Sequence, residues 1–181
     1  MAKISIDIKK GKVKKESPLI IGIDLGTTNS LVAYIKDGEA VAVKGKDGKS
    51  TLVPSIIHFG EKQEIIVGDK AKEMLITNPE DTIYSVKRLM GKSYKDVEGF
   101  ENYFGYKIID EDTDSLVKIR VKDKFYTPIE LSAEILRELK ERIENVLGEI
   151  VGKCVITVRA YFNDAQSQAN GDAGKLDRLD V

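Results

Sequence analysis

The run IIGIDLGTTNSLVA at residues 20–33 places the strongest constraint on how this chain folds. An apolar strand leads into Asp24, a tight turn follows at Gly26, and a second apolar stretch returns. Glycine has no Cβ, so a turn there lets the backbone approach a bound anion closely. The N–H groups of the turn and the hydroxyls of Thr27 and Thr28 can donate to phosphate oxygens. The pattern predicts a phosphate-binding hairpin, with Asp24 placed to hold magnesium through water, since this ion keeps much of its hydration shell.

An ordinary hairpin is the alternative interpretation of the same residues. Glycine between two strands is commonly only a turn. The motif is neither the GxxxxGK[ST] loop nor the dinucleotide-binding GxGxxG. The rest of the chain must therefore decide between the two interpretations.

Composition limits the class of protein. The chain has 181 residues, of which 41% are hydrophobic and 33% charged, which is typical of one soluble globular domain or two small subdomains. Its 29 basic residues nearly balance its 30 acidic residues. This balance lacks the basic surplus that is typical of nucleic-acid binding.

Single residues exclude two further kinds of chemistry. Cys154 is the only cysteine and lies in an apolar run, so we interpret it as a buried strand residue rather than a nucleophile. His58, the only histidine, is interpreted in the same way, and a zinc site of histidine and cysteine ligands is not credible.

The first 18 residues are rich in lysine and contain no apolar stretch of signal-peptide length. We interpret them as a solvated tail with a short strand at 4–8, and an electrostatic tether is the alternative. No segment is apolar enough to span a membrane. We therefore expect a cytoplasmic protein that binds neither membrane nor nucleic acid.

Periodicity predicts a chain of mixed α and β elements. Strands are expected at 20–25, 31–35, 40–43, 56–59, 65–67, 106–109, 116–121, 124–126 and 155–158. Helices are expected at 69–75, 82–90, 128–147 and 164–176. The helix at 128–147 has the strongest signals, because Thr127 and Glu130 form a capping-box pattern and Gly148 follows its end. Asn163 is placed to cap the last helix.

Four ordered segments carry a family resemblance: DLGTTNS at 24–30, VPSIIHF at 53–59, TNPEDTIYSVKRLMGK at 77–92 and VITVRAYFNDAQSQA at 155–169. Together they closely resemble the N-terminal part of the nucleotide-binding domain of heat-shock protein 70 chaperones, over about 19–181. The segment SVKRLMG and the lysine-bearing extension resemble the branch that serves iron–sulfur cluster assembly.

This resemblance implies the first lobe of an α/β actin-like ATPase domain, with a ribonuclease-H-like motif, a mixed sheet and flanking helices. Its implied divisions are a basic extension at 1–18, a first core part with the phosphate hairpin at 19–52, an inserted smaller subdomain at 53–127 and a return to the core at 128–181. In the family two lobes close on ATP, and hydrolysis drives the grip on a client peptide.

The resemblance also implies functional residues. Asp24 would be a catalytic, magnesium-associated carboxylate, and Lys87 would reach the γ-phosphate and serve hydrolysis. Phosphate contacts would come from the turn, namely Gly26, Thr27, Thr28 and Asn29. Without the motif, Lys87 would be interpreted as part of a solvated helix face. The implied cofactors are ATP or ADP with magnesium, and the implied partners of a full-length parent are a J-domain co-chaperone, a nucleotide-exchange factor and client peptides.

The chain departs from the family pattern at its end. The family continues beyond the position of Val181 with a second catalytic carboxylate and a second lobe. We therefore expect poor adenine affinity, no meaningful ATPase from this chain alone, and self-association through an unpaired sheet edge.

The last helix departs from the family pattern VPAYFNDAQRQATKDAG. The differing residues are Arg159 for proline, Ser167 for arginine, Asn170 and Gly171 for threonine and lysine, and Asp177 and Arg178 where alanine and glycine are usual. The proline and arginine relay ATP binding to the client domain in the family, so this coupling is in doubt. An altered C-terminus and a degenerate copy both fit these differences.

Two functions follow from the sequence. The first is the ATP-binding part of a molecular chaperone. The alternative is a non-catalytic binding module that keeps the fold but has lost nucleotide function. A third class, the sugar kinases with an actin-like fold, fits poorly because the segments at 53–59 and 77–92 resemble chaperones specifically.

Overall fold

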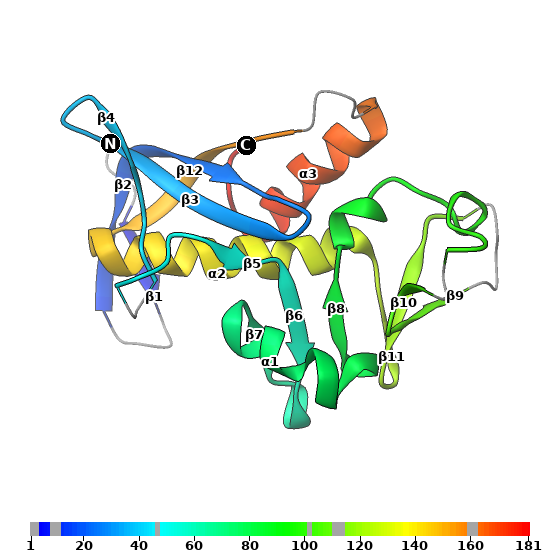
Figure 1. Ribbon diagram of the computed structural model, residues 1–181. Helices are drawn as coiled ribbons and strands as arrows, with labels where there is room; N and C mark the ends of the chain where they lie inside the picture. The colour runs from blue at the N-terminus through cyan, green and yellow to red at the C-terminus, as the bar shows by residue number, and fades with distance from the viewer. Residues whose placement is uncertain (1–3, 8–11, 46–47, 101–102, 110–114, 159–162) are drawn as a thin grey trace.

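The computed structural model describes residues 4–7, 12–45, 48–100, 103–109, 115–158 and 163–181, with side chains from Pro18 onward. Figure 1 shows a large mixed sheet on one side of a long helix, and smaller sheets on the other side. Among the described residues, the structure contains no helix that is both long and apolar enough to cross a membrane.

The large sheet has six strands. They are β1 (Ile4–Asp7), β2 (Lys12–Asp24), β3 (Asn29–Lys36), β4 (Glu39–Ala42), β5 (Val53–Pro54) and β12 (Ile150–Ile156). The strands β1 to β4 follow one another as antiparallel neighbours, β5 pairs with β3, and β12 lies parallel to β2. Because β12 is the parallel neighbour of β2, the two strands end at the same edge of the sheet.

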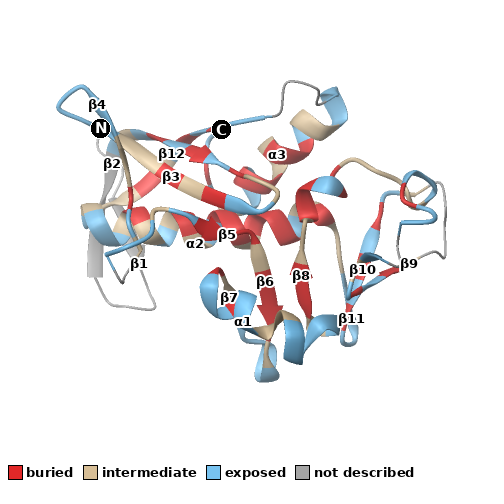
Figure 2. Ribbon diagram, viewed as in Figure 1, coloured by how far each residue is buried: buried red, intermediate tan, exposed pale blue. Residues whose placement is uncertain are grey.

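Helix α2 (Pro128–Leu147) packs against this sheet and forms as the sequence predicts. The Thr127 hydroxyl accepts a hydrogen bond from the Glu130 amide, and the Glu130 carboxylate accepts one from the Thr127 amide at 2.7 Å. Gly148 ends the helix in the left-handed conformation, with φ of 71°. The apolar stripe of the helix is buried, as Figure 2 shows; it consists of Leu131, Ile135, Leu139 and Ile143.

Helix α3 (Asp164–Leu176) packs on α2 and is capped by Asn163 as expected, since the Asn163 side chain accepts from the Gln166 amide. After this helix the chain returns to the large sheet. The amide of Cys154 donates to the carbonyl of Asp180 at 2.9 Å, beside a parallel bridge between Lys153 and Asp180.

Two three-stranded sheets lie on the other side of α2 (Figure 1). One contains β6 (Ile56–Phe59), β7 (Ile65–Val67) and β8 (Thr82–Tyr84), and the other contains β9 (Lys107–Ile109), β10 (Lys118–Val121) and β11 (Lys124–Tyr126). Helix α1 (Asp69–Thr77) packs on the first. Four short 3-10 helices complete the described elements: η1 (Glu61–Gln63), η2 (Pro79–Asp81), η3 (Val86–Arg88) and η4 (Tyr94–Asp96).

The predicted helix at 82–90 is wrong. Residues 82–84 form β8, which pairs antiparallel with β6, and only 86–88 form a helical turn. Ser85 separates them in the left-handed conformation, with φ of 57°. The helical spacing in this segment therefore arises from a strand followed by a 3-10 turn, and pairing with a distant strand decides the outcome.

The predicted strand at 155–158 is shifted. The observed β12 begins at Ile150 and ends at Ile156, because its pairing with β2 starts at Glu16 and includes an irregularity between Val151 and Lys153. The first part of β12 contains polar and small residues, which interrupt the apolar pattern from which a strand is predicted. The predictions for His58 and Cys154 are confirmed, since both are buried strand residues.

Candidate functional site

The first member of the site is the carboxylate at the end of β2. Asp24 is exposed, and the Thr157 hydroxyl donates to its Oδ1 atom at 2.7 Å. The amide of Thr157 also donates to the carbonyl of Ile23 at 2.9 Å, which continues the β12–β2 ladder by one residue. A carboxylate at the edge of the sheet is therefore held in one orientation by a residue 133 positions later in the chain.

The turn between β2 and β3 needs glycine for a local reason. A Cβ atom on Gly26 would lie 1.9 Å from the carbonyl oxygen of Asn29, so no other residue fits without moving the backbone. The amide of Gly26 donates to the Ser30 hydroxyl at 3.1 Å. Glycine thus permits the turn to close on itself, and its own N–H is used inside the turn rather than left for an anion.

The next three turn residues lie beside Asp24 at the end of the hairpin. Thr27 is half-buried, and the residues Thr28 and Asn29 are exposed. The carbonyl of Thr28 accepts from the amide of Ser55 at 2.8 Å, which fixes the backbone of the turn tip. Two hydrogen bonds therefore hold the turn between the end of β2 and the start of β3, and Thr28 and Asn29 are exposed at its tip.

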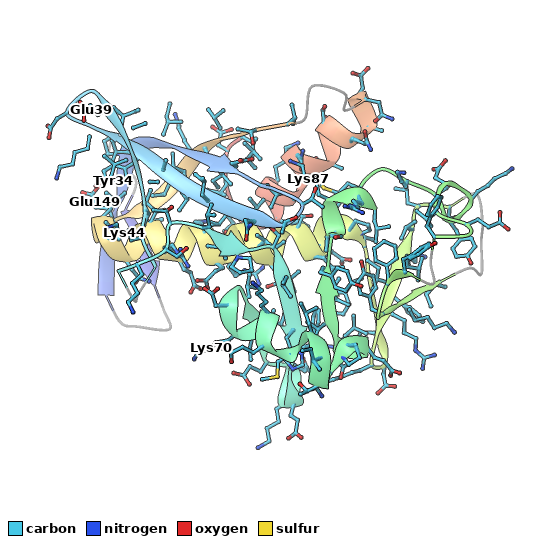
Figure 3. The ribbon with its side chains drawn as sticks, in the orientation of Figure 1. Tyr34, Glu39, Lys44, Lys70, Lys87 and Glu149 are labelled. Carbon is cyan, nitrogen blue, oxygen red and sulfur yellow. The ribbon has the colours of Figure 1, made fainter. Side chains whose placement is uncertain are left out.

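Lys87 approaches the same loop from η3. Its side chain is buried, with 6% exposure, and its ammonium group donates to the backbone carbonyl of Leu25. Figure 3 shows Lys87 next to the end of the β2–β3 hairpin. The left-handed Ser85 begins the turn that carries this lysine. The ammonium group therefore contacts the residue between Asp24 and Gly26, although Lys87 lies 62 positions after that residue in the chain.

The residues present fit a magnesium ion held mainly by water and phosphate. Within the described ranges, no group of three or more histidine, cysteine, aspartate or glutamate side chains is arranged to hold a metal ion. Magnesium is usually bound through one or two carboxylates with retained waters and substrate phosphates, and the exposed carboxylate of Asp24 provides such a contact.

The other reactive side chains do not belong to this site. His58 is buried and shares a hydrogen bond of 2.9 Å with the Thr82 hydroxyl. Burial raises the pKa of the Cys154 thiol to about 11, so the thiol stays protonated at neutral pH.

Sequence reasoning missed three residues that support the loop, namely Ser30, Ser55 and Thr157. Serine and threonine at the ends of strands carry no strong signal by themselves. Only the parallel β12–β2 pairing and the β3–β5 pairing show that these residues contact the hairpin.

Comparison with known protein families matches residues 20–181 to the family described as Hsp70 protein. Members of this family are chaperones that bind ATP or ADP with magnesium. The mixed sheet with helices α2 and α3 fits a partial actin-like ATPase lobe, as the sequence predicts. Since the match covers nearly the whole chain, this protein belongs to the Hsp70 family.

Proposed function

We propose that the chain presents the phosphate-binding and magnesium-binding half of a chaperone ATP site. The observation that carries this proposal is the buried Lys87, whose ammonium group contacts the Leu25 carbonyl at the base of the glycine turn. A cation, a carboxylate and a hydrogen-bonded turn lie at one edge of the sheet. A nucleoside triphosphate with magnesium requires such groups to bind its phosphates and its metal ion.

Each residue has a separate role in the proposal. Lys87 supplies positive charge toward the terminal phosphate, where a compact ammonium group is well suited. The tip residues Thr27, Thr28 and Asn29 donate hydrogen bonds to phosphate oxygens. Gly26 closes the turn, because a Cβ atom at this position would lie 1.9 Å from the Asn29 carbonyl oxygen.

Asp24 orients the waters around magnesium. Its Oδ1 atom already accepts from Thr157, so the second carboxylate oxygen remains for metal-bound water. When bound, magnesium neutralises charge on the phosphate oxygens.

Isothermal titration calorimetry with magnesium and ATP tests the proposal. The variants are Asp24→Asn, which keeps the shape of the side chain, and Lys87→Met, which keeps its length. Lys70→Met is the matched control, because Lys70 is an exposed lysine on α1 and lies away from the hairpin (Figure 3). We expect saturable binding by the unmodified chain and by the control. In the two site variants affinity should fall by at least about tenfold, the loss expected for one charge-assisted hydrogen bond.

The alternative function is a non-catalytic binding module. The departures Asn170 and Gly171 in α3 support it, because they lower the stability expected of this helix. No binding at millimolar nucleotide by a chain that is folded by circular dichroism would favour this alternative and refute the proposed ATP site.

Finer assignments rest on the resemblance. We propose that the protein belongs to the iron–sulfur cluster assembly branch, with SVKRLMG at 85–91 as support, and acts in the cytoplasm with a J-domain co-chaperone, a nucleotide-exchange factor and client peptides. Biolayer interferometry with J-domain proteins of the iron–sulfur and general chaperone systems tests the branch. Preference for the general system would contradict it.

We also propose the division at residues 53 and 127 into a core and an inserted subdomain. Limited proteolysis tests this division. First cuts within the stretch 19–52 instead of near the two boundaries would argue against it.

A further inference from the structure

Two serine hydroxyls are buried directly beneath the glycine turn. Ser30 is 1% exposed and Ser55 is 2% exposed, and their Oγ atoms are 2.8 Å apart. Ser30 belongs to β3, and Ser55 follows β5, which pairs with the start of β3. The two residues are therefore brought together by strand pairing across 25 positions of sequence.

These hydroxyls form a short chain of hydrogen bonds that ends on the turn. The amide of Gly26 donates to Ser30 Oγ at 3.1 Å, and Ser30 Oγ bonds with Ser55 Oγ. The backbone amide of Ser55 donates to the carbonyl of Thr28 at 2.8 Å. The stretch 26–28 is thus fixed at both of its ends, and Ser55 takes part at each end.

The two serines depend on each other energetically. A buried hydroxyl without a partner is costly, whereas a satisfied pair adds only a modest net stabilisation. Removing either hydroxyl leaves the other with one bond fewer in a buried place. The effects of removing both should therefore be smaller than the sum of the single effects.

We propose that Ser30 and Ser55 are positioning residues for the phosphate-binding turn, and that they couple anion binding at 27–29 to the strand β5. The binding part of this inference rests on the proposed ATP site. Donors that are already fixed before the anion arrives lose less freedom on binding, which strengthens the complex. Because β5 forms the first two residues of the predicted subdomain 53–127, a shift of that segment changes the turn through this pair.

Hydrogen exchange of the Gly26 amide, followed by nuclear magnetic resonance without nucleotide, tests the positioning role directly. Ser30→Ala should speed this exchange about tenfold relative to amides within α2, because the acceptor is lost. Ser55→Ala should speed it less, because Ser30 still accepts. Ser132→Ala is the matched control, since Ser132 is equally buried at 1% but bonds to Met90 instead of the turn.

Calorimetry with magnesium and ATP on the same variants tests the coupling. We expect both single variants to lose affinity, the double variant to lose less than the product of the two single fold-changes, and Ser132→Ala to match the unmodified chain. If Gly26 exchange rises only as much as exchange in α2, the serines stabilise the fold generally and the positioning role is refuted. Independent effects on affinity would refute the coupling. If the unmodified chain binds no nucleotide, the proposed ATP site fails, while the exchange data still decide the positioning role.

Discussion

Gly171 in α3 and Gly148 after α2 offer a paired test of how backbone conformation governs stability. Gly171 lies inside the helix Asp164–Leu176, and Gly148 has φ of 71°. A Cβ atom added at either position would meet no atom within 4 Å. The same substitution to alanine therefore adds one methyl group in open space at both sites, and only the backbone conformation differs.

The expected effects have opposite signs. In a helix interior alanine is favoured over glycine by about 1 kcal/mol, and it also reduces the freedom of the unfolded chain. In the left-handed conformation a non-glycine residue costs roughly 1–2 kcal/mol. Gly171→Ala should raise the free energy of unfolding by about 1 kcal/mol, and Gly148→Ala should lower it by about as much or more.

Thermal unfolding followed by circular dichroism at pH 7 measures both effects. For a chain of this size, 1 kcal/mol corresponds to about 2–4 °C in Tm. We expect a rise of that size for Gly171→Ala and a fall for Gly148→Ala, with unchanged spectra before unfolding. Shifts in the same direction, or no shift for Gly171→Ala, would refute the reasoning, because α3 would then not unfold together with the core.

Three further predictions use other parts of the molecule. Asn170→Thr, which restores the family residue, should raise Tm in the same assay, because Asn170 is 1% exposed and neither polar atom of its amide has a hydrogen-bond partner in the described structure; a lower Tm would contradict this. Gly26→Ala should abolish magnesium–ATP binding in calorimetry while the chain stays folded, because the new Cβ would clash with the Asn29 carbonyl at 1.9 Å; unchanged affinity would show that the turn is adaptable. Burial raises the pKa of Cys154 from 9.0 to about 11, so its contribution to stability is full below pH 9 and is lost as pH rises toward 11. Urea unfolding between pH 8 and 11 should show a smaller alkaline loss for Cys154→Ala than for the unmodified chain, and parallel curves would contradict the shift.

Local signals in the sequence predict those parts of the fold that local physics decides. The bounds of α2 at Pro128 and Leu147 follow from a capping box, a four-residue apolar repeat and a terminal glycine, all of which lie within the helix or next to it. The segment 82–90 fails for the opposite reason. Its conformation depends on pairing with β6, which lies several elements earlier in the chain. The spacing of apolar residues that is typical of a helix also occurs when a strand precedes a 3-10 turn.

The candidate site likewise has one part that local sequence predicts and one part that depends on tertiary structure. The loop 24–29 is contiguous, so its glycine, hydroxyls and carboxylate are visible together in the sequence. Lys87 was found only through the family motif, because the buried position of its side chain depends on the left-handed Ser85 before it. The contact of Lys87 with the turn is a tertiary contact, which periodicity does not predict and which the family resemblance indicates.

Thr157 and the serine pair show why the residues that support the site are not predicted from the sequence. Alternate residues of β12 face opposite sides of the sheet, with Cys154 and Ile156 buried and Val155 exposed. A slip of one residue in the β12–β2 pairing would move Thr157 to the buried side and away from Asp24. The orientation of the Asp24 carboxylate thus depends on a strand register that the core residues set. A substitution in that core which shifts the register should therefore weaken nucleotide binding without touching any residue of the phosphate turn.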